Sequence, residues 1–349
     1  MLALLFKPRV RRKLFHCNTP LGGAQLDKEG NDDAKGGSRF GMGRVRQAIV
    51  RIENARRIVQ FLCFLLFNAA IFGLGPWPLF LPVLQSLGAP SKTVGDAFGV
   101  LQLMLYDGVF PWLPLASIFL AAMASGRILC GWACPFGFVQ DLLKYVKRKQ
   151  AEFSLRTHET MIKAKHGILL LTLFISGSLA VSMFSEVGEG YVKALGTFAP
   201  APFEALSPAN TLFAILPGVI FDIRYAIFRV MEAPESILTG ILSLSPLFWL
   251  RFAIMVIVLA LGVYVQRSWC RYLCPEGALL ALLNRFSFLG LKRDPLKCTR
   301  AECRACVEVC PMKVRILDLP WEKFTDPECI YCLKCVSACS TKALRPKFL

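Results

Sequence analysis

Twelve of the fourteen cysteines in this chain fall into two short motifs, and each motif occurs twice. Near the C-terminus, one run holds Cys298, Cys303, Cys306 and Cys310, and a second holds Cys329, Cys332, Cys335 and Cys339. A shorter motif is formed by Cys130 with Cys134 and again by Cys270 with Cys274. Disulfide frameworks belong to small secreted domains, whereas tight C-x2-C and C-x3-C spacings are typical of metal ligands. We therefore expect these sulfurs to bind metal.

The C-terminal runs have the spacing of a bacterial two-cluster ferredoxin, except that x4 replaces x2 after Cys298. In such ferredoxins the fourth cysteine of each run binds the other cluster. This rule predicts two 4Fe-4S clusters, one on Cys298, Cys303, Cys306 and Cys339 and one on Cys310, Cys329, Cys332 and Cys335. A zinc ribbon is the alternative, because C-x2-C pairs also bind zinc. Zinc, however, has no need of the third and fourth cysteines at this spacing in both runs.

Four apolar segments predict a membrane protein. The hydrophobic fraction of 55% far exceeds the charged fraction of 19%, and a helix needs about 20 apolar residues to cross a bilayer. The segments are Ile58–Gly75, Gly108–Gly126, Gly167–Ser185 and Pro246–Gln266, of which the last is interrupted only by Arg251. We expect an all-α membrane domain of four transmembrane helices over residues 58–291, followed by a small α+β ferredoxin domain over residues 292–349.

The distribution of Lys and Arg predicts the orientation of these spans. Residues 1–57 hold 13 of the 41 basic residues, residues 127–166 hold 8 and residues 267–349 hold 15. Because cytoplasmic flanks carry the excess of positive charge, we expect a multi-pass protein of the bacterial inner membrane with both termini in the cytoplasm. Residues 1–57 then form a basic cytoplasmic tail without a cleavable signal. Nucleic-acid binding is not expected from the charge of +17, since no helix–turn–helix or RNA-binding signature accompanies it.

The shorter cysteine motif belongs to an internal repeat. The phrases Arg127-Ile-Leu-Cys130-Gly-Trp-Ala-Cys134-Pro135 and Arg267-Ser-Trp-Cys270-Arg-Tyr-Leu-Cys274-Pro275 align at an offset of 140 residues. The membrane domain is therefore expected to consist of two repeated hairpins, each ending in C-x3-C-P. Brought together, the repeats would present four thiolates, enough for a further metal or cluster. Alternatively, each pair of cysteines is a redox dithiol or a pair of packed structural cysteines.

The cysteine content predicts electron transfer. The absence of haem and dinucleotide motifs limits the class of electron donor or acceptor. The chain has no C-x-x-C-H for covalent haem and no G-x-G-x-x-G for a dinucleotide. A membrane electron carrier without these sites would most simply exchange electrons with the quinone pool. Quinol binding needs an apolar pocket with a few polar groups for its protons. The candidates near the apolar outer loops are Asp107, Glu186, Glu189 and Tyr191.

With these motifs, over roughly residues 55–345, the chain resembles the NapH-type membrane ferredoxins and the related MauN proteins. The resemblance implies two 4Fe-4S clusters, cytoplasmic termini and transfer of quinol electrons toward a periplasmic redox partner, which would be a ferredoxin, a cytochrome or a reductase subunit. The x4 gap, the longer outer loop between the third and fourth spans and the extended N-terminal tail depart from the family pattern.

Two related types offer other expectations. The NosR type carries a large flavin-binding domain before its spans, for which the N-terminal segment is too short. The CcoG type, a metal-reducing assembly factor for respiratory oxidases, carries a folded domain after its ferredoxin, whereas this sequence stops ten residues past Cys339. A metal- or thiol-reducing assembly factor nevertheless stays the alternative function.

Overall fold

The computed structural model describes residues 36–73, 75, 77–89, 92–147, 154–183, 188–220, 245–299 and 303–349 of the chain. The helices are α1 (Gly36–Phe67), α2 (Ala97–Tyr106), α3 (Trp112–Ser125), α4 (Ile128–Trp132), α5 (Pro135–Leu143), α6 (Leu155–Ser182), α7 (Gly188–Leu195), α8 (Pro208–Asn210), α11 (Pro246–Tyr264), α12 (Ser268–Tyr272), α13 (Pro275–Leu283), α14 (Ala305–Glu308) and α15 (Lys334–Ala338). The strands are β1 (Phe80–Leu81), β2 (Gly95–Asp96), β3 (Leu289–Arg293) and β4 (Leu344–Phe348).

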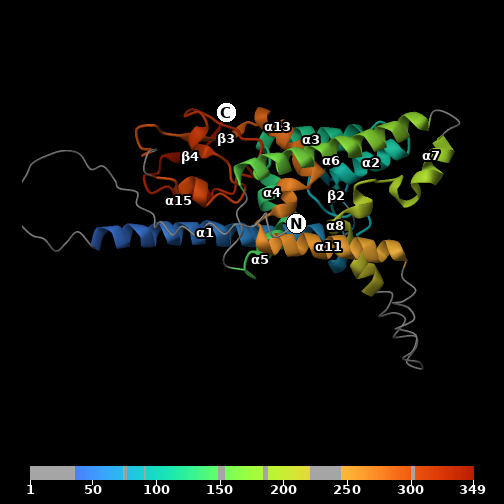
Figure 1. Cartoon of the computed structure of the whole chain (residues 1–349), viewed down its shortest axis with the longest axis horizontal. Helices are drawn as coiled ribbons and strands as arrows, with labels where there is room; N and C mark the ends of the chain where they lie inside the picture. The colour runs from blue at the N-terminus through green and yellow to red at the C-terminus, as the bar shows by residue number, and fades with distance from the viewer. Residues whose placement is uncertain are drawn as a thin grey trace, which may run out of the picture.

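The long helices α1, α6 and α11 run along the long axis of the molecule, and the C-terminal unit lies beside α1 and at one end of α6 and α11 (Figure 1). Helices α2, α3, α6 and α13 contact one another on one side, and α5 packs against α1 and α11 on the other. Helix α12 contacts both α6 and α11 and so joins the two sides. In the C-terminal unit, β3 and β4 form an antiparallel pair beside α14 and α15. This unit begins with β3 at Leu289, slightly before the expected boundary at residue 292.

The two sequence repeats form the units α3–α4–α5 and α11–α12–α13, and they are interleaved. Helix α5 of the first repeat packs on α11 of the second, and α13 of the second packs on α3 of the first. In each unit the second cysteine of the motif caps the last helix, because the Sγ atoms of Cys134 and Cys274 accept the N–H groups of Gly137 and Gly277. The two expected hairpins are therefore not separate units, because the last helix of each repeat packs on the first helix of the other.

Among the described residues, two helices are long and apolar enough to cross a membrane, Arg156–Ser182 within α6 and Pro246–Tyr264, which is α11. The other two expected spans are shorter as helices. Helix α3 has 14 residues, which is about 21 Å against a hydrocarbon thickness of about 30 Å. The apolar end of α1 stops at Phe67, where the side chain of Asn68 donates to the carbonyl of Phe64 at 2.8 Å. The structure therefore shows two candidate membrane helices rather than four.

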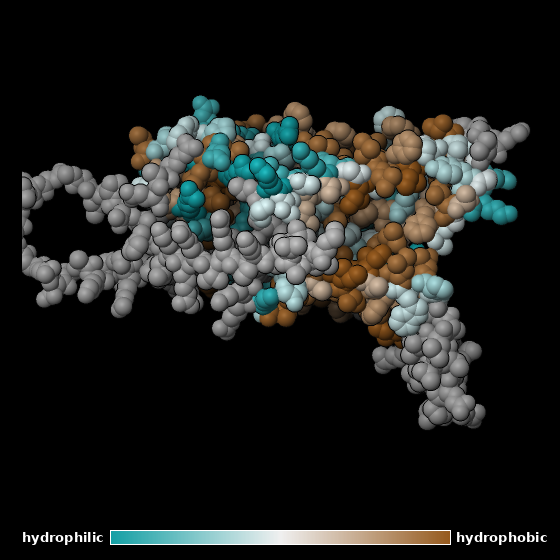
Figure 2. All heavy atoms as spheres, in the orientation of Figure 1, coloured by the Kyte–Doolittle hydropathy of each residue, from teal (hydrophilic) through white to brown (hydrophobic). Residues whose placement is uncertain are grey.

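Surface hydropathy changes along the long axis. Hydrophobic residues cover the end with α6 and α11, and hydrophilic residues gather over the C-terminal iron–sulfur unit (Figure 2). Exposed apolar side chains on α6 include Leu170, Phe174 and Val181, which are 72%, 68% and 73% exposed. A soluble protein would bury such a row, so this surface fits a lipid environment.

Helix α1 occupies part of the segment that we expected to be a tail. Residues 1–35 lie outside the described part of the chain, but α1 begins at Gly36 and packs on α15 and α5. Glu53 of α1 pairs with Lys144 at 2.7 Å and also with Lys334. Burial raises the pKa of Glu53, but these two lysines outweigh it and lower that pKa to about 2. The part of the expected tail from Gly36 onward is therefore helical and packs on other elements, and the boundary of the tail stays a prediction.

A buried ion cluster joins the C-terminal unit to the helices. Arg127 lies between α3 and α4, and its guanidinium donates to a carboxylate oxygen of Glu328 and to the carbonyl of Pro327, both at 3.0 Å. The Nζ atom of Lys165 in α6 contacts the same carboxylate. Both cations are 0% exposed, so Glu328 neutralises charge that has no access to water.

We expect Glu328→Gln to destabilise the protein by about 3–5 kcal/mol, because removing one partner of a buried ion pair leaves uncompensated charge. The measurement is thermal unfolding of the detergent-solubilised chain. The control is Glu322→Gln in the same unit, since Glu322 is exposed. Equal melting temperatures for the two variants would mean that the ion cluster does not stabilise the contact.

Candidate metal centres

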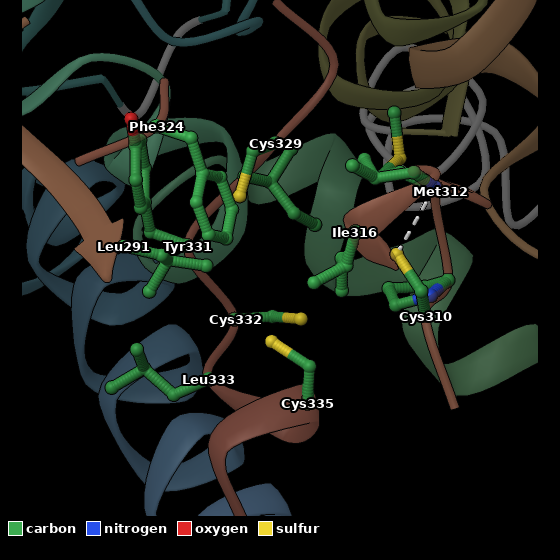
Figure 3. A pocket seen from close by; sticks show the side chains of 13 residues that line it. Leu291, Cys310, Met312, Ile316, Phe324, Cys329, Tyr331, Cys332, Leu333 and Cys335 are labelled. Carbon is green, nitrogen blue, oxygen red and sulfur yellow. Dashed lines mark hydrogen bonds between the residues drawn. The ribbon is translucent and has the colours of Figure 1, made fainter. Parts of the chain in front are cut away.

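One cavity in the C-terminal unit is lined by four cysteines, Cys310, Cys329, Cys332 and Cys335. The rest of its wall is apolar and includes Leu291, Ile316 and Phe324. The Sγ atoms of Cys332 and Cys335 point toward each other across the cavity (Figure 3). We call it the proximal cavity, because the loop between Cys329 and Cys332 contacts the helical repeats.

A second cavity is lined by the other four cysteines of the unit, Cys298, Cys303, Cys306 and Cys339. Arg293 and Leu344, a pair in the β3–β4 register, also line it. We call it the distal cavity. The two cavities contain the same two sets of four cysteines that the spacing rule assigns, and the x4 gap leaves Cys298 within its set.

The same loop follows the fourth cysteine of each run. Lys313 and Lys342 adopt φ values of 56° and 53°, a conformation that is uncommon for residues other than glycine. These turns bring the N–H of Val314 within 3.4 Å of Cys310 Sγ and the N–H of Ala343 within 3.2 Å of Cys339 Sγ. A backbone donor aimed at sulfur stabilises the negative charge of a ligating thiolate.

The donor sets fit clusters better than single ions. Among the described residues, no three Cys, His, Asp or Glu side chains are placed to hold one metal ion. In a 4Fe-4S cluster each thiolate binds a different iron, so the four cysteines surround the cluster without converging on one point. A zinc ribbon instead needs four ligands that converge on one ion. Burial raises the pKa of Cys306 and Cys310 to about 11, and iron binding would therefore displace thiol protons.

The two C-x3-C-P motifs are brought together by crossed hydrogen bonds from two buried arginines. Arg127 of the first repeat donates to the carbonyl of Cys270 at 3.4 Å. Arg267 of the second repeat donates to the carbonyl of Cys130 at 2.8 Å and forms an ion pair with Asp141 at 2.6 Å. The two arginines and Asp141 are 0% exposed. The repeated arginine thus links each motif to the other.

The four sulfurs of these motifs are almost completely buried. Exposure is 8% for Cys130, 4% for Cys134 and 5% for both Cys270 and Cys274. Burial raises the pKa of every one of these thiols. Catalytic dithiols are partly exposed and have lowered pKa values, whereas buried cysteines are inert. The geometry therefore favours a ligand or structural role over a dithiol that meets external substrates.

The first C-x3-C-P motif touches the loop that carries the proximal cysteines. The indole Nε1 of Trp132 donates to the carbonyl of Tyr331 at 2.9 Å. A Cβ added to Gly131 would lie 2.3 Å from the carbonyl oxygen of Ile330, so only glycine fits there. Cys130 belongs to the same buried cluster as Ile330 and Cys332. The first motif, at Cys130, therefore packs next to the loop of the proximal cavity.

The residues proposed for quinol lie on several elements. Asp107 ends α2, Glu189 is exposed in the first turn of α7, and the Tyr191 hydroxyl is 3.1 Å from that of Ser178 in α6. Glu186 lies outside the described residues. The structure does not assemble them into one cavity among those it describes, so their role stays a prediction.

Sequence reasoning missed three buried carboxyl groups in the helical part. Asp96 caps α2 by accepting from Phe98 and Gly99, and Glu204 accepts from the backbone N–H of Leu87. Glu276 is 2% exposed, and its Oε1 has no hydrogen-bond partner in the described part of the chain. An acid before an apolar helix is an N-cap signal and could have revealed Asp96. Nothing local distinguishes Glu204.

Comparison with known proteins agrees with these centres. The sequence matches a 4Fe-4S binding domain over residues 108–151 and 247–294, which are the two C-x3-C-P repeats. It matches a 4Fe-4S dicluster domain over residues 290–340. No solved structure matches the chain.

The relatives have low sequence identity to this chain, but their alignments cover most of it. An uncharacterized protein of Methanocaldococcus jannaschii is 24% identical over 71% of this chain and 84% of its own length. The methylamine utilization ferredoxin-type protein MauN of Methylobacillus flagellatus is 25% identical over 77% of this chain and 80% of its own. The ferredoxin-type protein NapH of Escherichia coli is 23% identical over 63% of this chain and 62% of its own.

We expect Cys332→Ala and Cys306→Ala to remove different clusters, since the two cysteines line different cavities. In anaerobically purified and reduced protein, EPR spin counting should find that each variant loses one 4Fe-4S signal and keeps the other. Cys63→Ala, in α1, is the control and should keep both. Loss of the same signal in both variants would contradict the assignment.

Proposed function

We propose that this chain, which belongs to the ferredoxin-type family that includes NapH, MauN, NosR and YccM, relays electrons within the membrane from the quinol pool toward a redox partner protein. The partner class would be a periplasmic ferredoxin, a cytochrome or a reductase subunit. The observation that carries the proposal is the packing of the first C-x3-C-P motif on the loop of the proximal cavity, where Gly131 meets Ile330 and Trp132 meets Tyr331. When bound, iron–sulfur clusters accept and release single electrons at potentials set by their surroundings.

We assign the eight cysteines of the two C-terminal cavities as ligands of two 4Fe-4S clusters. The four C-x3-C-P cysteines would hold a further metal or cluster. Gly137 and Gly277 support this role, because their N–H groups point at Cys134 Sγ and Cys274 Sγ at 3.4 and 3.3 Å. The side chain of Gln140 also donates to Cys270 Sγ at 3.2 Å. These donors would stabilise ligating thiolates in a buried site.

The remaining residues of this region hold the centres in place. Arg127 links Cys270 of one repeat to Glu328, the residue before Cys329. Trp132 fixes the carbonyl of Tyr331 between Cys329 and Cys332. The order of sites is therefore C-x3-C-P cysteines, proximal cavity and distal cavity. Ile330 and Tyr331, which lie between the first two sites, are 1% and 2% exposed and so limit the access of water to this path.

For the membrane, we propose four spanning segments with both termini in the cytoplasm of a bacterial cell. The two long apolar helices α6 and α11 support this arrangement. Helix α3 would cross together with the loop before it, and the end of α1 together with the loop after it. The basic segments, residues 1–57, 127–166 and 267–349, would all lie on the cytoplasmic side. Quinol would bind at the opposite side, near Asp107, Glu189 and Tyr191.

The assembly-factor alternative is less well supported. A metal- or thiol-reducing factor must bring its cysteines into contact with an external substrate. The repeat cysteines are at most 8% exposed, and the elements around them are tightly packed.

We expect a quinol analogue to reduce the clusters of the anaerobic protein in lipid nanodiscs, as followed by EPR and visible absorption. Cys130→Ser combined with Cys270→Ser should slow this reduction strongly, because it removes two sulfurs from the first centre. Cys63→Ser is the control and should react like the wild type. Dithionite should reduce the C-terminal clusters equally in all three proteins. If quinol leaves the wild-type clusters oxidised while dithionite reduces them, the quinol proposal is wrong.

The topology has its own test. In intact spheroplasts, a protease added outside should leave a C-terminal tag untouched and should remove it after the cells are lysed. A tag that is cleaved in intact cells would contradict the proposed orientation.

A further inference from the structure

We propose that a basic face beside the distal cavity is the docking site for a small, acidic, soluble electron-transfer protein. The face consists of Lys292, Lys297, Lys342 and Arg345, with Leu296 among them. This inference goes beyond the proposed function, because it assigns a second partner on the side of the ferredoxin unit. It rests on the cluster assigned to the distal cavity.

The strand register places part of this face directly behind the distal cavity. Arg293 pairs with Leu344, and both line the cavity. The neighbouring pair is Lys292 with Arg345, and successive residues of a strand point to opposite faces. Lys292 and Arg345 therefore stand on the outer face of the same two strands and are exposed.

This pair of basic residues is not explained by the fold. Like charges placed directly opposite each other on neighbouring strands destabilise a sheet. Within the described part of the chain neither side chain forms a salt bridge, whereas Arg293 on the inner face donates to the carbonyl of Leu319 at 3.0 Å. Unneutralised positive charge on this outer face is what an acidic partner would compensate.

The loops that hold two of the distal cysteines complete the face. Lys297 precedes Cys298, and its ion pair with Asp294 is a long one of 3.9 Å. Lys342 is exposed, and its backbone N–H donates to the carbonyl of Cys339 at 3.2 Å. Leu296 is 97% exposed between these basic residues. An apolar side chain surrounded by charge is typical of the centre of a transient protein interface.

The position of the face favours a protein over a lipid surface. The apolar surface that fits a bilayer lies over α6 and α11 (Figure 2), and the cavity whose loop contacts the helical repeats, through Trp132 of α4, is the proximal one. The face adjoins the distal cavity, where an electron carrier can approach a cluster. The proposed step moves one electron from a reduced [2Fe-2S] carrier to the oxidised distal cluster. The carrier is oxidised, the cluster is reduced, and no bond or proton changes.

The test uses the full chain with its clusters in nanodiscs of neutral lipid, and a reduced acidic plant-type [2Fe-2S] ferredoxin as the probe. Stopped-flow absorption at low salt gives the second-order rate of electron transfer. We expect Lys292→Glu combined with Arg345→Glu to lower this rate by about tenfold, because electrostatic steering raises association rates by 10–10³. Added salt should lower the wild-type rate and have little effect on the variant.

The matched control is Arg156→Glu combined with Lys163→Glu, which makes the same charge change at exposed positions of α6 and should keep the wild-type rate. Equal rates for the wild type and the Lys292/Arg345 variant would overturn the proposal. So would loss of binding to phosphatidylglycerol vesicles without loss of rate, which would make this a lipid-binding face. If the ferredoxin reaction behaves as expected but quinol reduces no cluster, only the quinol proposal fails.

Discussion

Arg127 and Arg267 carry buried positive charge across the interface between the two repeats, and the arrangement of the centres depends on them. A guanidinium without access to water must find acceptors within the protein. Each arginine does so by reaching a cysteine carbonyl of the opposite repeat. Their carboxylate partners differ, because Arg267 pairs with Asp141 of the first repeat and Arg127 with Glu328 of the ferredoxin unit. One repeated residue therefore joins the repeats to each other and to the iron–sulfur unit.

The contact with the ferredoxin unit also distinguishes the two repeats at the aligned positions 131 and 271. Gly131 in the first motif corresponds to Arg271 in the second. The carbonyl of Ile330 fills the space where a side chain of residue 131 would stand. Arg271 instead lies 3.1 Å from a ring nitrogen of His158. The backbone of the first motif can therefore approach the proximal cavity closely. Because of this contact, the proximal cavity lies between the C-x3-C-P cysteines and the distal cavity.

The cysteine spacing predicted the grouping of side chains well, and hydropathy predicted the spans less well. Cysteine spacing is a local property of loops whose turns, such as those at Lys313 and Lys342, repeat in the structure. Hydropathy counts apolar residues but does not register where a helix stops. The breaks at Asn68 and before Trp112 shorten two of the four expected spans as helices. The helix over the last part of the expected tail was missed, because its ion pairs with Lys144 and Lys334 are long-range.

The sequence by itself determined the chemistry of this protein: twelve cysteines at ligand spacing, two repeats and a basic flank on each apolar segment. Those features follow from local spacing and composition, which need no folded context to be recognised. Only the tertiary structure decided which centre adjoins which, because Arg127, Gly131 and Glu328 meet across intervals of about 200 residues. It also decided which charges are buried in pairs and which, like Lys292 and Arg345, remain on the surface, since strand register and packing are properties of the whole fold.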